Sequence, residues 1–274
     1  MAKPRTSSPR SGPVTAEPML PVVDGSGGVR SVQRALDILV LLTEDRPQIT
    51  VREIVEATGL AKTTALRLAQ TLVQCGLLWA TDSGYMAGPG LWRWAYLAKH
   101  AWELPPETQR MMGDMALEHQ ETVNLYIRRD IHRLCIAQKE SPRALRHVIS
   151  VGDELPLWAG ASARVLLVGA PVELLARVVA GAPRGRTDLE TLRSAVAETE
   201  SNGFAVSHGE RESGVSAVAV PVINQSGTVV SALSMSGSTA RFTEDRIPNF
   251  VSALRSAAVA MAGRGLGNAF QGTA

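Results

Sequence analysis

Cysteine is scarce in this sequence, and so are aromatic side chains. Only 2 of the 274 residues are cysteine, and aromatic residues make up 4% of the chain. Cys75 and Cys135 lie far apart, with no second cysteine or histidine at the spacing of metal ligands, which argues against a disulfide framework or a zinc site. We expect two reduced, buried thiols in a reducing compartment, because a free cysteine usually behaves as a small apolar residue.

Long apolar runs and an excess of charge are also missing. No stretch approaches the roughly 18 apolar residues that a membrane-spanning helix needs, and residues 1–20 lack the apolar core of a secretory signal. These absences predict a cytoplasmic protein with no membrane partner. The net charge is only +2, so binding to nucleic acid has to be argued from a local cationic surface.

Motifs for catalysis and for metal binding are absent as well. The sequence has no H-E-x-x-H motif, and no G-x-S-x-G motif with a partner histidine and acid at a telling spacing. His208 and Glu210 are close in sequence, but two residues do not make a metal site. We therefore expect no catalytic residues, no metal and no cofactor.

The ends of the chain have the composition of tails. Residues 1–28 are rich in proline, serine, glycine and threonine, without apolar periodicity, which predicts disorder. The glycine-rich run at residues 25–28 is interpreted as linker rather than as a phosphate-binding loop, because no strand precedes it. Residues 267–274 are expected to form a second tail. The apolar content of 45% is sufficient for two domains between these tails.

Three short helices and a hairpin are predicted between residues 29 and 89. Ser31 is a candidate N-cap for the first helix, and Pro47 disfavours helix beyond it. Thr50 and Glu53 form a T-x-x-E capping box that opens the second helix. The helices are expected at residues 32 to about 44, 50–59 and 62–74, and the strands at residues 77–80 and 85–87. This succession is typical of a winged helix-turn-helix domain.

The polar face of the third helix is the candidate DNA-binding surface. In a helix-turn-helix the N-terminal part of the recognition helix enters the major groove, where cationic and hydroxyl side chains reach phosphates and base edges. The alternative is a solvated face on a structural helix, and the hairpin tip at residues 82–84 has no lysine or arginine for phosphate contact. The candidate DNA-binding residues are Arg30, Arg34, Arg52, Lys62, Thr63, Thr64, Arg67 and Gln70.

A helix over residues 91–102 carries a large share of the few aromatic side chains. Trp92, Trp94, Tyr96 and Trp102 lie on it, and two prolines follow at residues 105–106. We interpret residues 90–106 as a linker helix between two domains that also pairs two subunits. The alternative is a helix that packs only on its own domain.

Residues 107–266 are predicted to form a second domain of the α+β class. Strands are expected at residues 122–127, 134–138, 146–149, 204–207, 215–223 and 229–235. Helices are expected at residues 108–119, 162–169, 172–180, 188–201 and 243–266. A sheet with helices on it is suited to a domain that senses a ligand.

Several motifs in both predicted domains resemble one family. They are Arg30–Leu39 (RSVQRALDIL), Thr50–Leu68 (TVREIVEATGLAKTTALRL), Glu121–Leu125 (ETVNL), Val151–Leu157 (VGDELPL), Glu212–Val222 (ESGVSAVAVPV) and Ala232–Gly237 (ALSMSG). From Val29 to Leu266 the chain resembles the IclR family of bacterial transcriptional regulators. The resemblance implies a GAF-like C-terminal domain, with a cup-shaped pocket for an effector that is commonly a small carboxylate or an aromatic catabolite. It also implies homodimers or homotetramers on palindromic double-stranded DNA operators.

The resemblance also carries effector-binding positions into this sequence. It implies that Ala161 and Ser162 offer backbone N–H groups to an anionic end of the effector, and that the hydroxyls of Ser234 and Ser236 donate. Trp158 stands where many relatives have histidine, which predicts a more apolar pocket and a larger, aromatic effector, unless Trp158 packs only in the core. The candidate effector-binding residues are Trp158, Ala161, Ser162, Ser207, Ala217, Ser234 and Ser236.

The expected function is therefore that of a sequence-specific transcriptional regulator, with repression favoured over activation, whose operator affinity depends on an effector. Two alternatives are kept open. One is an enzyme with a regulatory DNA-binding domain, although no nucleophile–base pair in the sequence supports it. The other is an architectural DNA-binding protein whose C-terminal domain senses nothing.

Overall fold

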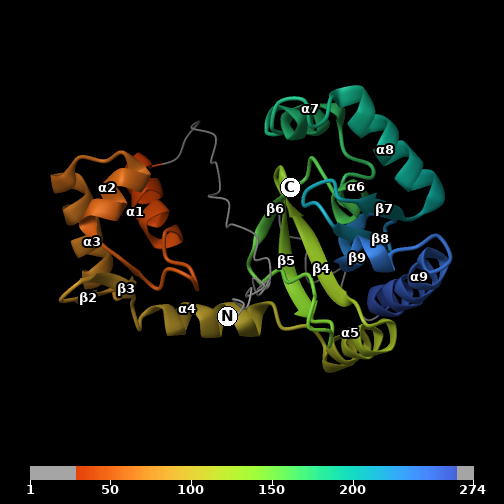
Figure 1. The fold of residues 1–274 in the computed structure, drawn as a ribbon, viewed down its shortest axis with the longest axis horizontal. Coiled ribbons are helices and arrows are strands. Elements are labelled where there is room, and N and C mark those ends of the chain that lie inside the picture. The colour runs from red at the N-terminus through yellow and green to blue at the C-terminus, as the bar shows by residue number, and fades with distance from the viewer. Residues whose placement is uncertain (1–28, 264–274) are drawn as a thin grey trace, which may run out of the picture. The chain divides into compact units, whose positions relative to one another are not determined.

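The computed structural model describes residues 29–263, which divide into two compact units between Glu103 and Leu104. The expected tails at residues 1–28 and 267–274, and the linker interpretation of residues 25–28, lie outside the described residues. Within the described part, no helix is both long and apolar enough to cross a membrane. Each unit has its own arrangement of helices and sheet (Figure 1).

The first unit is a winged helix-turn-helix. Its helices are α1 (Arg30–Val40), α2 (Val51–Thr58), α3 (Lys62–Gln74) and α4 (Leu91–Ala101). Its strands are β1 (Gln48–Ile49), β2 (Leu78–Thr81) and β3 (Gly84–Ala87), paired antiparallel in the order β1-β3-β2. The core is a cluster of buried apolar side chains that includes Ile38, Ile49, Ile54, Leu72 and Leu78.

The capping box predicted for α2 is confirmed. The Thr50 hydroxyl accepts from the Glu53 backbone N–H at 3.2 Å, and the Glu53 carboxylate accepts from the Thr50 N–H at 2.7 Å. Gly59 ends the helix with a φ of 68°, a conformation that glycine adopts at little cost. Helix α3 has the predicted bounds, Lys62–Gln74.

Two expectations for this unit are wrong in detail. Helix α1 has Val29 as its N-cap rather than Ser31, and it ends at Val40, because Thr43 and Arg46 bond each other's backbone in a turn. Strand β1 was not predicted, since two residues are too few to show an alternating pattern.

Glycines attach the wing to the end of α3. The N–H of Gly90 donates to the Gly76 carbonyl, and the N–H of Gly88 donates to the Leu77 carbonyl, both at 2.9 Å. A Cβ atom at either Gly88 or Gly90 would collide with the Gly76 backbone. The close approach of these backbones fixes the hairpin against α3.

The two cysteines differ from each other. Cys135 is buried, as expected, but Cys75 is exposed, because it is the residue that caps the C-terminal end of α3 and not part of its apolar stripe. Burial, with a smaller contribution from the Asp153 carboxylate, raises the pKa of the Cys135 thiol to about 12. At neutral pH Cys135 therefore has almost no thiolate, the form that reacts.

This difference predicts thiol reactivity. In the native protein an aromatic disulfide reagent is expected to modify Cys75 only, and in denaturant both cysteines should react. Mass spectrometry of the modified protein measures this directly, with Cys75→Ser as the control that should abolish native labelling. Rapid native labelling of Cys75→Ser would contradict the burial of Cys135.

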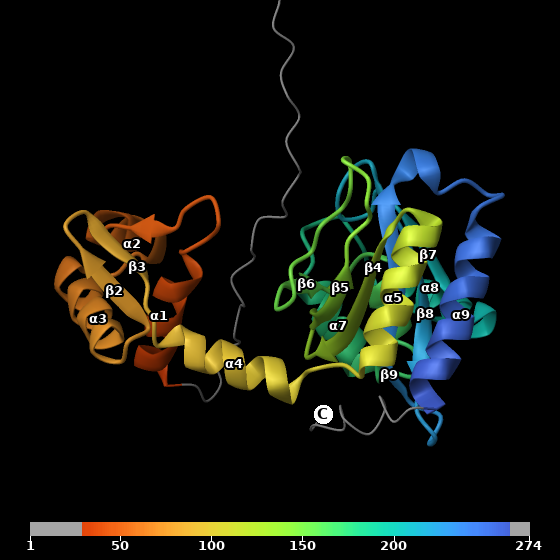
Figure 2. The ribbon, with the colours of Figure 1, turned by 90° about the horizontal axis from the view of Figure 1, so that it is seen from below.

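The second unit is a six-stranded antiparallel sheet with helices on both faces. Its strands are β4 (Thr122–Arg129), β5 (His132–Lys139), β6 (Glu154–Pro156), β7 (Ala205–His208), β8 (Val215–Ile223) and β9 (Val229–Ser238), in the order β6-β5-β4-β9-β8-β7. Its helices are α5 (Pro106–His119), α6 (Ala161–Leu166), α7 (Val172–Ala180), α8 (Leu189–Asn202), α9 (Ile247–Gly263) and the 3-10 helix η1 (Thr239–Arg241). Helices α5 and α9 cover one face, as Figure 2 shows, and α6 to α8 lie on the other.

Alternation along the strands gives the two faces different chemistry. On β9, Leu233 and Met235 point into the apolar cluster under α5 and α9, which contains Phe250. The intervening Ser234 and Ser236 point to the opposite face. One face of the sheet is thus a continuous core, and the other combines a second apolar cluster with a polar region.

The strand predicted at residues 146–149 is wrong, since this segment is a loop with a single bridge at Val148. The edge of β5 with which it could pair is taken by residues 152–156, where β6 and the Gly152 N–H bond β5. The final helix begins at Ile247 rather than at residue 243, after a turn whose bonds return to the Thr243 carbonyl. Its predicted extension to residue 266 lies outside the described residues.

Candidate functional site

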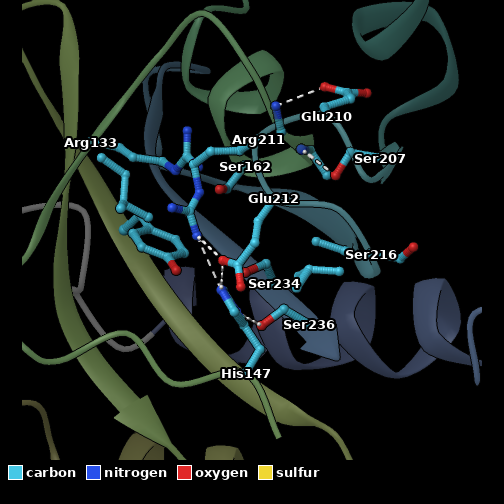
Figure 3. Close-up of a pocket in the computed structure, with 16 residues that line it drawn as sticks. Arg133, His147, Ser162, Ser207, Glu210, Arg211, Glu212, Ser216, Ser234 and Ser236 are labelled. Atoms are coloured by element: carbon cyan, nitrogen blue, oxygen red, sulfur yellow. Dashed lines mark hydrogen bonds and ion pairs between the residues drawn. The ribbon is translucent and has the colours of Figure 1, made fainter. Parts of the chain in front are cut away.

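The polar region of the second unit contains a cavity with a volume of about 50 Å³. It lies on the sheet face that carries α6, between the strands, the start of that helix and the segment that joins β7 to β8 (Figure 3). Its lining residues are Tyr126, Arg133, His147, Leu155, Gly160, Ala161, Ser162, Ser207, Glu210, Arg211, Glu212, Val215, Ser216, Ala217, Ser234 and Ser236.

Serine hydroxyls from the strands form one wall of the cavity. Ser236 is held by the side-chain amide of Asn124, whose Nδ2 donates to its Oγ at 3.1 Å. Nδ1 of His147 lies 3.2 Å from the same Oγ, from a loop far away in sequence. Strands β4 and β9 pair with Asn124 opposite Ser234, so their register brings these groups together.

The start of α6 forms a second wall. Its first backbone N–H groups are already hydrogen-bonded to side chains of the protein. The Gly160 N–H donates to the Glu210 carboxylate at 2.8 Å, and the Ala161 N–H donates to the Ser207 hydroxyl at 3.1 Å. The same Glu210 carboxylate makes a close ion pair with Arg164. A backbone N–H at a helix start favours an anion, and here that anion is an acidic side chain of the β7–β8 segment.

The segment between β7 and β8 also brings in Arg211 and Glu212. Nη2 of Arg211 lies 3.2 Å from Oε2 of Glu212 and 3.1 Å from Nε2 of His147. The hydrogen bond with His147, together with the charges of His147 and Arg211, keeps the pKa of Glu212 below its usual value despite burial. This carboxylate therefore stays ionised at neutral pH.

Arg133 is the most buried cation of the cavity, with 4% of its surface exposed. Its Nη1 donates to the Pro156 and Ala159 carbonyls at 2.5 and 2.8 Å, and its guanidinium lies over the Tyr126 ring at 5.7 Å. Burial lowers the pKa of Arg133 to about 10, so the side chain is still protonated at neutral pH.

Six of the seven predicted effector-binding residues line this cavity, namely Ala161, Ser162, Ser207, Ala217, Ser234 and Ser236. Trp158 does not line it; its half-buried side chain packs against the apolar cluster beneath α6 to α8. The lining also contains charged side chains that the expectation of a more apolar pocket did not include. No group of residues in the described part of the chain could hold a metal ion.

The charged lining was not predicted from the sequence. Arg133, His147, Glu210, Arg211 and Glu212 come from a strand and two loops, and only the tertiary fold brings them together. One signal was available in the sequence. Arg133 lies two residues before the buried Cys135 on β5, so the two side chains point to the same face of the sheet. An arginine in such a position is almost never fully buried without a partner.

In the first unit most of the predicted DNA-binding residues are exposed, and five of them lie on α3. Lys62, Thr63, Arg67 and Gln70 are exposed and Thr64 is half-buried, opposite the buried side of the helix. Arg30 and Arg34 of α1 are also exposed. Arg52 of α2 is exposed as well, but it makes an ion pair with Glu56 at 2.7 Å, which partly neutralises it.

Comparison with known protein families matches both units to domains of the same family. Residues 31–80 match the IclR helix-turn-helix domain, and residues 97–262 match the C-terminal domain of the bacterial transcriptional regulator IclR. The chain belongs to the IclR family of bacterial transcriptional regulators. Its winged helix-turn-helix and its α/β domain with a curled sheet are the two parts of an IclR-type regulator.

Individual proteins resemble it over most of their length. A crystal structure of an IclR-family regulator from a Rhodococcus species is 39% identical, with a TM-score of 0.60, over 94% of this chain and 100% of that one. The HTH-type transcriptional regulator KipR of Bacillus subtilis is 27% identical over 84% of this chain and 94% of its own. An IclR homologue from Microbacterium hydrocarbonoxydans, solved with 4-hydroxybenzoate, shares the fold at 24% identity, with a TM-score of 0.68 over 85% and 98% of the two chains.

Proposed function

We propose that this IclR-family regulator is a cytoplasmic repressor that binds a palindromic operator through α3 and releases it, or binds it differently, when an effector enters the cavity of the second unit. The observation that carries the proposal is the pairing of two features in one chain. A helix-turn-helix presents an exposed cationic recognition helix, and a separate unit contains a polar cavity of ligand type. Binding at the two sites must then be coupled reciprocally.

The DNA contacts are proposed for the exposed face of α3 and its neighbours. Lys62, Thr63 and Thr64 lie in the first turn, where the backbone N–H groups and the helix dipole favour phosphate. Arg67 lies one turn further, and no ion pair within the described residues engages it. It is therefore available for a guanine edge or a phosphate.

Arg67→Ala is expected to weaken operator binding by about 1–3 kcal/mol if the side chain reads a base. The loss should then be concentrated at one operator position, whereas a phosphate contact would weaken binding equally for all sequences and reduce the salt dependence. Fluorescence anisotropy with operator variants at several salt concentrations measures both. Arg193→Ala, an exposed arginine on α8, is the matched control and should change nothing. Unchanged binding by Arg67→Ala would mean that α3 does not face the DNA.

The effector is proposed to be a carboxylate or an aromatic catabolite bound among the lining residues of the cavity. The Microbacterium homologue, which has the same fold, was solved with 4-hydroxybenzoate, a ligand that is both a carboxylate and aromatic. A cavity of about 50 Å³ has room for about four water molecules, so an aromatic ring would require the β7–β8 segment to move outward. We propose no catalytic residues for this site.

Self-association is proposed to involve α4. None of the side chains of α4 is buried, although the helix carries the exposed aromatic residues Trp92, Trp94 and Tyr96. A soluble protein rarely leaves such an apolar surface uncovered. A homodimer through α4, alone or within a homotetramer, would cover it and would supply the two recognition helices that a palindromic operator requires.

A further inference from the structure

The start of α6 is an obvious place for the anionic end of an effector, but its first amides already have partners. The carboxylate of Glu210 accepts from the Gly160 N–H, and the hydroxyl of Ser207 accepts from the Ala161 N–H. Glu210 is itself neutralised by Arg164. An effector anion at this position would have to displace a carboxylate of the protein, together with its ion pair.

One cation beside the start of α6, the Arg133 guanidinium next to Ala159 and Gly160, lacks such compensation. Three arginines lie in or beside the cavity, and two of them are paired, Arg164 with Glu210 and Arg211 with Glu212. Arg133 makes no ion pair with any described residue, and its buried Nε has no hydrogen-bond partner. Arg211 is close enough to disfavour the charge on Arg133. A buried cation without a counter-ion is costly, so its retention indicates that an anion completes the site.

We propose that the anionic group of the effector binds the guanidinium of Arg133, not the amides at the start of α6. The serine wall of β9 and His147 then face the rest of the ligand and hydrogen-bond its hydroxyl or carbonyl groups (Figure 3). The ligand class that fits the cavity as it stands is a short hydroxylated carboxylate. This inference rests on the proposed function, because it concerns the effector site of a regulator.

Binding of glycolate and of its neutral analogue glycolamide tests the proposal. Both probes are titrated into the full chain at constant ionic strength, with two-dimensional NMR or calorimetry as the readout. Wild-type protein is expected to bind glycolate at least about tenfold more tightly than glycolamide, because a charged partner adds more than a neutral one. Arg133→Gln should remove that preference, and Arg177→Gln, an exposed arginine on α7 outside the cavity, should keep it.

Glu210→Gln separates the two possible anion sites. If the anion binds Arg133, this variant should keep the preference for glycolate over glycolamide that Arg133→Gln loses. If the anion instead replaces Glu210 on the amides, Glu210→Gln should change the affinity strongly while Arg133→Gln should not, and the proposal is then wrong. It is equally wrong if wild-type protein does not bind glycolate.

Arg133 also holds the Pro156 and Ala159 carbonyls, so Arg133→Gln could fail to fold. Arg133→Lys keeps the charge with fewer donors, and it is expected to prefer glycolate to glycolamide, but less than the wild type does. Operator binding without any ligand is measured on the same variants. If the wild type binds no operator, the proposed function is wrong. If operator binding is normal but the Arg133 variants bind glycolate as tightly as the wild type, only this inference is wrong.

Discussion

Arg241→Ala is expected to lower the free energy of unfolding by about 3–5 kcal/mol. Glu121 is completely buried at the start of β4, and Arg241 binds both of its oxygens, Nε at 2.6 Å and Nη2 at 2.8 Å. Removal of the arginine leaves a buried carboxylate with only the more distant Arg246, at 3.8 Å, for compensation. The buried carboxylate also raises the pKa of Arg241, so the guanidinium is charged throughout the accessible pH range.

This ion pair also supports the cavity. Thr122, the residue after Glu121, pairs with Ser236 in the register of β4 and β9, and Ser236 is part of the serine wall. Gly237 follows it, and a Cβ atom there would collide with the Glu121 carboxylate. We therefore expect Arg241→Ala to weaken effector binding in addition to stability.

Urea unfolding monitored by circular dichroism measures the stability loss. Arg193→Ala is the matched control, because this arginine is exposed on α8 and makes no ion pair with the described residues. The double variant Glu121→Met with Arg241→Met should be less destabilised than Arg241→Ala, because it leaves no buried carboxylate without its main partner, and Arg246 is partly exposed to solvent. A loss below about 1 kcal/mol in Arg241→Ala would show that Glu121 finds another partner or takes up a proton.

The double variant Trp92→Ala with Trp94→Ala is expected to raise the dimer dissociation constant by at least about 30-fold, or about 2 kcal/mol. Trp92 is 80% exposed and Trp94 61% exposed within the single chain. Large aromatic side chains in the centre of an interface commonly dominate its binding energy. Loss of the dimer should also abolish tight operator binding, because one recognition helix reads only half a palindrome.

Sedimentation velocity at a series of protein concentrations measures this effect. Trp79→Ala serves as the matched control, since Trp79 is 56% exposed but lies on β2 of the wing rather than on α4. Wild-type self-association that persists unchanged in the α4 variant would place the interface elsewhere. A strong effect of Trp79→Ala with none of the α4 variant would assign the interface to the wing.

Local signals in the sequence predicted the elements that depend on them. The bounds of α3, α7 and β8 were predicted to the residue, because each has a long apolar pattern bounded by proline or glycine or by a clear change of period. Strands β1 and β6 were missed because two or three residues show no period. The segment at residues 146–149 was wrongly predicted as a strand. It has β propensity, but no strand edge is free to pair with it.

The site could be predicted only where the family resemblance supplied positions. It supplied the serines of β9, Ser207 and the start of α6, all of which lie at the cavity. It did not supply Arg133 or the Glu210–Glu212 segment, whose contacts join parts of the chain dozens of residues apart. Of the two alternatives for Trp158, the structure agrees with packing in the core, because the ring packs against the apolar cluster under α6 to α8.

We expect this IclR-family regulator to bind specific operators under the control of an effector. Selection of genomic fragments by the purified full chain at near-physiological salt, followed by sequencing, is the experiment that tests this expectation. We expect a shared palindromic motif, with half-sites spaced by whole turns of DNA for two α3 helices. We also expect Arg67→Ala to select these fragments only weakly. Salt-sensitive binding to fragments without any common motif would contradict these expectations and would favour an architectural DNA-binding protein.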